Sequence, residues 1–198
     1  MQQRIVLASN NAKKAVELTA LLAPLDYLVV SQAELGVSEA EEPFPGFVEN
    51  ALTKARHAAR HTGLPAVADD SGLCVRALDG APGVHSARFA GEPRSDARNN
   101  ALLLERLAGQ DDRRAYFYSA VVFVRHGEDP RPLIAEGVWH GEILTAEQGA
   151  GGFGYDPLFL VPELGLSAAE LAPADKNRLS HRGQAMQALL AQLRTEGA

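Results

Sequence analysis

The stretch Ala66-Val67-Ala68-Asp69-Asp70-Ser71-Gly72 places two adjacent acids directly after a short apolar run. The run predicts a buried strand, and ligands of open α/β sheets collect outside the carboxyl ends of strands. Two neighbouring carboxylates repel each other and cost stability unless a cation or a donor compensates them. Mg²⁺ prefers a few carboxylates with phosphate oxygens, so this pair could hold it and position water. The same residues also fit a turn in which Asp70 bonds the backbone, and the motif alone does not decide.

Outward from this stretch, short apolar runs alternate with periodic apolar patterns. The runs predict strands at residues 5–8, 27–30, 66–68, 115–124, 133–139 and 159–161, with a further candidate at 73–78. The periodic patterns predict helices at residues 12–22, 47–61, 96–107 and 180–194. An ordered loop is expected at residues 36–46, and turns at 79–83 and 127–130. The longest strand, 115–124, is apolar on both faces and should lie centrally. This order predicts an α/β fold with a mixed twisted sheet and flanking helices.

Length and composition limit the classes of protein that fit. The 198 residues suit a single domain, residues 1–198, because no repeat or linker interrupts them. The net charge of -6 gives no general attraction to nucleic acid or anionic membrane, so neither partner is expected. Cys74 is the single cysteine, which excludes an intramolecular disulfide. The N-terminal residues lack the apolar core of a signal peptide and no segment reaches a membrane-spanning length, so a cytoplasmic location is expected.

Two predicted helices begin with positive charge, which opposes the helix macrodipole. The first begins at Ser9-Asn10-Asn11-Ala12-Lys13-Lys14, directly after a strand, and the last at Ser180-His181-Arg182-Gly183. A bound anion at the helix N-terminus removes the conflict, because free backbone donors also point there. Each segment alone fits an ordinary capped helix with solvated cations. Two such starts together favour a shared anionic ligand.

The segment Gly151-Gly152-Phe153-Gly154-Tyr155-Asp156-Pro157 is rich in glycine, which lets a backbone approach a ligand closely. Phe153 and Tyr155 could stack on a base, and Asp156 could accept a hydrogen bond from a ring N–H. The alternative is a tight loop whose aromatic side chains fill the core. A core plug does not need so many glycines, which favours the binding loop.

Four charged residues are weaker candidates, because each has an ordinary structural explanation. Glu41 and Glu42 could bind metal from the acidic loop, although most acidic loop residues are simply solvated. Lys54 and Lys176 could reach phosphate, or could extend from packed faces into water.

Taken in order, these motifs resemble the inosine triphosphate pyrophosphatase family, especially the bacterial dITP/XTP pyrophosphatases, over essentially the whole chain. The matching pieces are Ser9-x-Asn11-x-x-Lys14, Glu41-Glu42, Phe47-x-Glu49-Asn50-Ala51, Lys54-Ala55, Ala68-Asp69-Asp70-Ser71-Gly72-Leu73, Gly80-Ala81-Pro82-Gly83, Ser86-Ala87-Arg88, Gly151 to Pro157 and Ser180-His181-Arg182-Gly183. Each piece is short, but the ordered set is highly specific. Two departures are Ser9, where threonine is often found, and His85, where an aromatic residue is common.

The resemblance implies a magnesium-dependent hydrolase of nucleotide metabolism that converts ITP, dITP and XTP to the monophosphate and pyrophosphate. It also implies a fold of two lobes with a central cleft, and a homodimer. By position, Asp70 would activate water and bind the metal with Glu41, with Glu42 as the neighbouring alternative. The implied substrate contacts, mainly to phosphate, are Ser9, Asn10, Asn11, Ala12, Lys13, Lys14, Lys54 and Ser71. The implied nucleoside contacts are Phe153, Gly154, Tyr155, Asp156, Lys176, His181 and Arg182.

Two other functions stay open at this point. One is a pyrophosphatase of related fold that acts on modified pyrimidine or methylated guanine triphosphates. The other is a nucleotide-binding protein without catalysis, against which the presence of both Asp70 and Lys14 argues. Arg182 is the candidate that distinguishes a 6-keto purine from adenine, because a keto oxygen accepts a hydrogen bond and an amino group does not.

Overall fold

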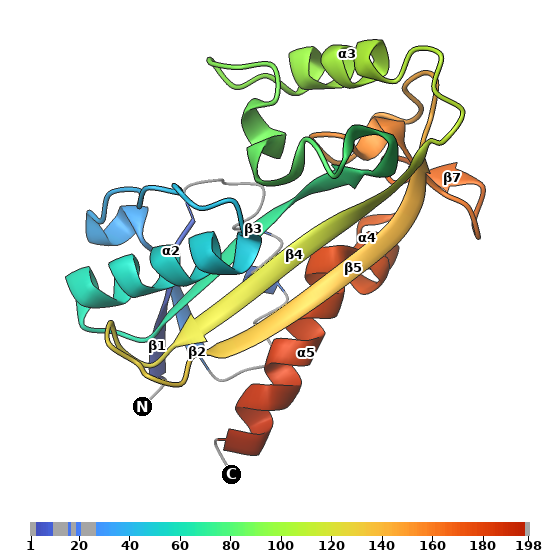
Figure 1. Cartoon of the computed structure of the whole chain (residues 1–198). Helices are drawn as coiled ribbons and strands as arrows, with labels where there is room; N and C mark the ends of the chain where they lie inside the picture. Colours follow the sequence, from blue (N-terminus) through green and yellow to red (C-terminus); the bar gives the residue numbers. More distant parts are fainter. Residues whose placement is uncertain (1–2, 10–15, 17–18, 21–26, 197–198) are drawn as a thin grey trace. The chain divides into compact units, whose positions relative to one another are not determined.

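The computed structural model describes residues 3–9, 16, 19–20 and 27–196 (Figure 1). The predicted helix at 12–22 falls on residues outside this set, apart from 16, 19 and 20. The strands are β1 (Gln3–Leu7), β2 (Tyr27–Ser31), β3 (Ala66–Val75), β4 (Arg114–Val124), β5 (Leu133–Ile143), β6 (Phe159–Val161) and β7 (Leu166–Ser167). The helices are α2 (Phe47–Thr62), α3 (Asp96–Arg106), α4 (Pro173–Leu179) and α5 (His181–Glu196). Among the described residues, no helix is long and apolar enough to cross a membrane.

The strands form one seven-stranded sheet in the order β2-β1-β3-β4-β5-β6-β7. Strand β1 runs parallel to both β2 and β3, whereas β6 runs antiparallel to β5 and β7. The mixed α/β sheet with flanking helices is therefore confirmed, and β4 takes the central place expected from its two apolar faces.

The chain divides into two compact units. The first contains Met1–Asp70, Ser119–Gly137 and His181–Ala198, and the second contains Ser71–Tyr118 and Val138–Ser180. Strands β3, β4 and β5 each contribute residues to both units.

In the first unit, α5 packs on the sheet face that carries the odd-numbered residues of β3 and β4. Its Ala185, Met186 and Leu189 form a buried cluster with Val67 and Val121. The backbone of α5 comes so close to β5 that a Cβ atom on Gly137 would lie 2.8 Å from the Ala185 nitrogen and closer still to the His181 carbonyl oxygen. Glycine at position 137 is therefore required for this approach.

Helix α2 packs on the other face of the same strands. Its buried side chains are mostly alanines, namely Ala51, Ala55, Ala58 and Ala59, and such short side chains allow a close approach to the sheet. The helix ends at Gly63, which adopts φ +68°, a left-handed conformation that glycine enters without steric cost. The predicted helix at 47–61 is confirmed.

The second unit has an aromatic core. The Phe159 ring lies 4.6 Å from Phe117 and 5.1 Å from Trp139, measured between ring centroids. Leu103 of α3 and Tyr155 pack into the same cluster. Ser95 caps α3 by accepting a hydrogen bond from the Arg98 nitrogen, as the sequence predicts.

Two expectations about β3 are wrong. The strand does not end before Asp69 but continues through the acidic pair to Val75, so the turn interpretation fails. The second strand expected at 73–78 is absent, because β3 covers its first half and a 3₁₀ helix, Arg76–Leu78, covers its second. A Cβ atom on Gly72 would meet the Gly83 carbonyl oxygen, so glycine lets the Gly83–Arg88 turn pack on the strand at this point.

Candidate active site

Strand β3 presents Asp69 and Asp70 to opposite faces of the sheet, because successive side chains of a strand alternate. Asp70 meets α2, and Asp69 meets the N-terminal end of α5. Both residues are buried. A buried carboxylate is costly unless it is paired and hydrogen-bonded, and each acid finds its partners on its own face.

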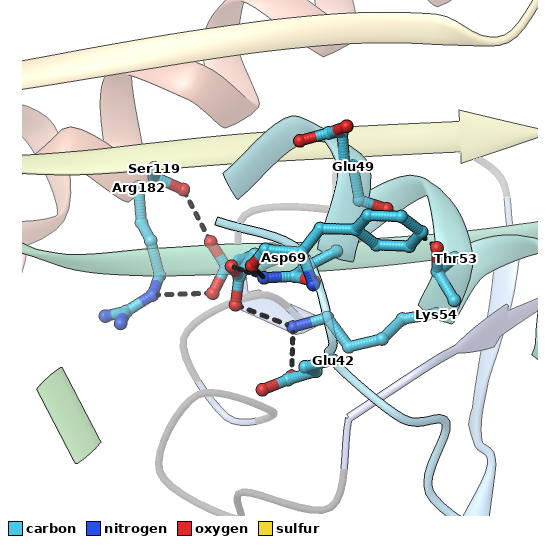
Figure 2. Close-up of polar contacts among 10 residues, drawn as sticks. Glu42, Glu49, Thr53, Lys54, Asp69, Ser119 and Arg182 are labelled. Carbon is cyan, nitrogen blue, oxygen red and sulfur yellow. Dashed lines mark hydrogen bonds and ion pairs between the residues drawn. The ribbon is translucent and has the colours of Figure 1, made fainter. Parts of the chain in front are cut away.

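Lys54 links Asp70 to the acidic loop that precedes α2. Its ammonium nitrogen lies 2.9 Å from Asp70 Oδ1 and 2.8 Å from Glu42 Oε1 (Figure 2). The side chains of Lys54 and Asp70 are 14% and 8% exposed and that of Glu42 is 26% exposed, so solvent screens these contacts only partly.

The pKa of Lys54 is raised by this setting. Burial alone would lower the pKa, but the negative charges of Asp70 and Glu42 and their hydrogen bonds outweigh burial. Lys54 therefore stays a cation, and its single positive charge pairs with two carboxylates.

Asn50 explains why the acidic loop reaches this place. Its side-chain oxygen accepts a hydrogen bond from the Phe44 nitrogen at 3.1 Å, and its amide nitrogen donates to the Phe44 carbonyl at 3.0 Å. The same nitrogen lies 3.5 Å from Asp70 Oδ2. A single buried amide thus fixes the loop to α2 and brings it beside Asp70. Asn50 is given no role by the sequence motifs above, although a polar residue on the alanine face of a helix is a signal for one.

Asp69 lies between two residues from other elements. Its Oδ1 accepts a hydrogen bond from Ser119 Oγ of β4 at 2.5 Å, and its Oδ2 lies 3.3 Å from Arg182 Nε of α5 (Figure 2). The charge pattern predicts that His181 and Arg182 lie on an exposed helix face. Both residues are instead buried. Ser119 was not predicted, although it places a hydroxyl in the apolar run of the central strand.

The glycine-rich loop forms a second cluster, within the second unit. Asp156 is buried, and its Oδ2 accepts hydrogen bonds from Lys176 Nζ at 2.7 Å and from the Phe153 nitrogen at 2.8 Å. The Lys176 ammonium also lies 4.8 Å from the centre of the Phe153 ring. The structure therefore brings Lys176 to two residues of the predicted binding loop.

Tyr155 belongs to the core and not to a stacking surface. The residue is buried, and its hydroxyl donates to the Ser86 carbonyl oxygen at 2.8 Å. Burial raises the pKa of its phenol, with a smaller contribution from the charge of Asp96. For Tyr155 the core-filling alternative is correct, whereas Phe153 stays partly exposed.

Helix α3 holds the same loop at Gly154. Asp96 Oδ2 accepts from the Gly154 nitrogen at 2.8 Å, and Asn100 Nδ2 donates to the Gly154 carbonyl at 3.2 Å and to Glu147 Oε1 at 2.7 Å. Asp96 and Asn100 are one helical turn apart, so they face the same side. Gly154 adopts φ +62°, which suits glycine at the held position.

The remaining predicted residues are placed as follows. Asn10, Asn11, Ala12, Lys13 and Lys14 lie outside the described residues, whereas Ser9 and Ser71 are described and partly buried. Glu41 is exposed, and the neighbouring Glu42 is the acid beside Asp70. Within the described part of the chain, no three His, Cys, Asp or Glu side chains gather as a metal site.

The sequence profile of the Ham1 family matches residues 5–192. The chain belongs to the Ham1 family. The match includes the elements that carry Asp69, Asp70 and their partners, namely α2, β3, β4 and the first turns of α5. It also includes the glycine-rich loop.

Curated relatives of this Ham1 chain are similar over nearly their full length. The dITP/XTP pyrophosphatase of Aromatoleum aromaticum is 71% identical over 195 residues, which cover 98% of each chain. The dITP/XTP pyrophosphatase of Bordetella pertussis is 63% identical over 198 residues, covering 98% of this chain and 93% of that protein.

Solved structures of relatives have the same fold as the Ham1 chain. A HAM1 protein from Coxiella burnetii superposes with a TM-score of 0.91 at 48% identity, covering 98% of this chain and 99% of the other. A nucleoside-triphosphatase, also titled dITP/XTP pyrophosphatase, from Mycobacterium abscessus gives a TM-score of 0.76 at 44% identity, with 95% and 99% covered.

Proposed function

We propose that this chain hydrolyses non-standard purine nucleoside triphosphates, ITP, dITP and XTP, to the nucleoside monophosphate and pyrophosphate, and so cleans the nucleotide pool. One observation carries the proposal: Asp70, a buried carboxylate in a Ham1-family chain, is held beside Lys54 and Glu42. This arrangement supplies a proton acceptor and a cation at one place, which is what attack of water on a phosphoric anhydride requires.

Asp70 is the proposed catalytic residue, and its carboxylate would accept the proton of the attacking water. Lys54 would then stabilise charge on the phosphate oxygens, since its raised pKa keeps it positive. Ser9 to Lys14 and Ser71 are the proposed phosphate-binding residues, on the strength of the resemblance. Phosphoryl transfer depends chiefly on such positioning and charge neutralisation.

The residues near Asp70 fit a divalent cation. Hard carboxylate oxygens of Glu42 and Asp70 come within 3 Å of one ammonium group, so the site already gathers two anions around one cation. We propose that Asp70 and Glu42 would hold Mg²⁺, with Glu41 as the alternative that the resemblance implies. When bound, Mg²⁺ would supply positive charge to the triphosphate and the attacking water.

The nucleoside would be read by a second group of residues: Phe153, Gly154, Asp156, Lys176, His181 and Arg182. Phe153, which lies beside Lys176, would stack on the base. Arg182 would donate to the 6-keto oxygen of hypoxanthine or xanthine. An adenine amino group would leave that buried donor unpaired, which costs about 1–3 kcal/mol.

Other properties are proposed from the resemblance. The two units would form one pyrophosphatase domain, residues 1–198, that acts as a homodimer. A cytoplasmic location and a small-molecule substrate, without nucleic acid or membrane, fit the acidic balance of the chain.

The test is pyrophosphate release measured with Mg²⁺ across ITP, XTP, dTTP and ATP. We expect turnover of ITP and XTP that exceeds turnover of ATP and dTTP by more than tenfold, and we expect Asp70→Asn, a nearly isosteric change, to abolish it. A preference for dTTP, or ITP binding without pyrophosphate release, would contradict the proposal.

A further inference from the structure

Asp69 is not among the residues proposed to touch substrate, yet its side chain is more deeply buried than those of Asp70, Lys54 and Glu42. Its side chain has no exposed surface, and that of Arg182 is 6% exposed. Ser119, which donates to Asp69, is also fully buried. Replacing a buried ion pair by apolar residues is often neutral or stabilising, so this pair is weak evidence for a contribution to stability. A role in orienting neighbouring groups is the alternative.

The contact with Arg182 is made at Nε. A guanidinium is planar, so holding Nε against a fixed carboxylate limits rotation of the whole plane and sets the direction of its terminal N–H groups. The carboxylate is itself fixed, because Ser119 Oγ lies only 2.5 Å from its other oxygen. Strand β4 thus locks a side chain of β3, which locks a side chain of α5.

We propose that Asp69 and Ser119 are positioning residues that aim Arg182 at the purine 6-position. The inference rests on the proposed function, in which Arg182 reads the 6-keto group. Asp69 and Ser119 act through Arg182 and do not touch the substrate. They determine how sharply a keto group is distinguished from an amino group, because a misaligned donor loses its hydrogen bond to the keto oxygen.

The same geometry ties base recognition to the catalytic carboxylate. Asp69 and Asp70 are consecutive residues of β3. The residue that orients Arg182 is therefore fixed to the same backbone as Asp70. Sites built on strands are positioned more precisely than sites on loops, and positioning of a reacting group demands such precision.

The test compares Ser119→Ala with Ser167→Ala. Ser167 is an equally buried serine of the second unit, and its hydroxyl donates to the Gln148 carbonyl and not to Asp69, so it controls for loss of a buried hydroxyl. We expect Ser119→Ala to raise KM for ITP and to lower the ratio of kcat/KM for ITP over ATP by about tenfold, with kcat for ITP changed less than threefold. Ser167→Ala should leave the ratio unchanged.

A second pair of variants keeps the test decisive if Ser119→Ala does not fold. Ser119→Thr retains the hydroxyl and should retain the ratio, whereas Asp69→Asn should lower it. If the wild-type enzyme prefers ITP but Ser119→Ala and Asp69→Asn lower kcat/KM for ITP and ATP by the same factor, the positioning role is wrong and the proposed function stands. If the wild-type protein releases no pyrophosphate from ITP, both proposals fail.

Discussion

Lys54 forms a bridge to Asp70, with its ammonium nitrogen 2.9 Å from Oδ1 of the acid. The helix that carries Lys54 and the strand that carries Asp70 therefore meet through a charge pair and not through apolar packing alone. Because the same ammonium group also binds Glu42, its removal takes a positive charge away from two carboxylates.

Lys54→Met should lower both activity and stability. We expect a loss of at least a hundredfold in kcat for ITP, because the cation proposed to stabilise the phosphate oxygens is removed. Unfolding in urea should show a loss of about 1–3 kcal/mol, since partly buried acceptors lose a charged donor. Arg60→Met is the control: its partner Glu128 is largely exposed, so this variant should match the wild-type protein in both assays. Equal effects of the two variants would remove Lys54 from the site.

The two glutamates of the acidic loop give a matched pair. Glu42 bonds Lys54, whereas Glu41 is exposed. Glu42→Gln should therefore raise the Mg²⁺ concentration needed for half-maximal ITP hydrolysis by about tenfold or more, and Glu41→Gln should leave it nearly unchanged. Titration of both variants with Mg²⁺ measures this directly. The reverse result would assign the metal to Glu41, as the resemblance implies.

Gly137→Ala tests how closely α5 must approach β5. The added methyl group meets the backbone of His181 and Ala185, which has no room to move without shifting the helix. We expect a loss of about 1–3 kcal/mol in the free energy of unfolding and a lower preference for ITP over ATP, because Arg182 moves with the helix. Gly46→Ala is the comparison, since the nearest atoms to its methyl group belong to the side chain of Glu49 and not to backbone. A Gly137→Ala protein with wild-type stability would show that the contact is loose.

The turn between β4 and β5 should make stability depend on pH. Burial would raise the pKa of Asp129, but hydrogen bonds from the Arg125 and Arg131 nitrogens and the Arg125 guanidinium lower it below its ordinary value. A lowered folded-state pKa stabilises the protein above the unfolded-state value, near 4, and this stabilisation is lost as the pH falls through the folded-state value. Asp129→Asn should be less stable at pH 7, and the difference should shrink at pH 3. A difference that is constant between these pH values in urea unfolding would contradict the charge argument.

Much of the fold follows from local pattern. The apolar runs predict β1, β2, β4 and β6, and the alanine face of residues 47–61 predicts α2, because burial on one or two faces leaves a periodic trace. β7 and α4 leave almost none, since β7 has two residues and α4 has seven. The continuation of β3 through two acids was also hidden, because partners that neutralise them come from distant parts of the chain.

The candidate site could also be predicted only in part from the sequence. The residues proposed to carry the chemistry, such as Asp70 and Arg182, stand out in the sequence. Their partners do not, because Asn50 and Ser119 act through contacts between elements far apart in the chain. Even Arg182 was expected at an open helix start, whereas its charge is neutralised by Asp69 across 113 residues.

The alternation of β3 has a consequence for how this chain can vary. One residue inserted between Asp69 and Asp70 would put both carboxylates on the same face, and one residue deleted before Asp69 would leave Lys54 facing Ser71. Either change would keep the residues of the motif but would alter which face of the sheet each side chain occupies. Length changes in this strand are therefore far more damaging than substitutions of comparable size, and the loops are where the chain is free to grow or shrink.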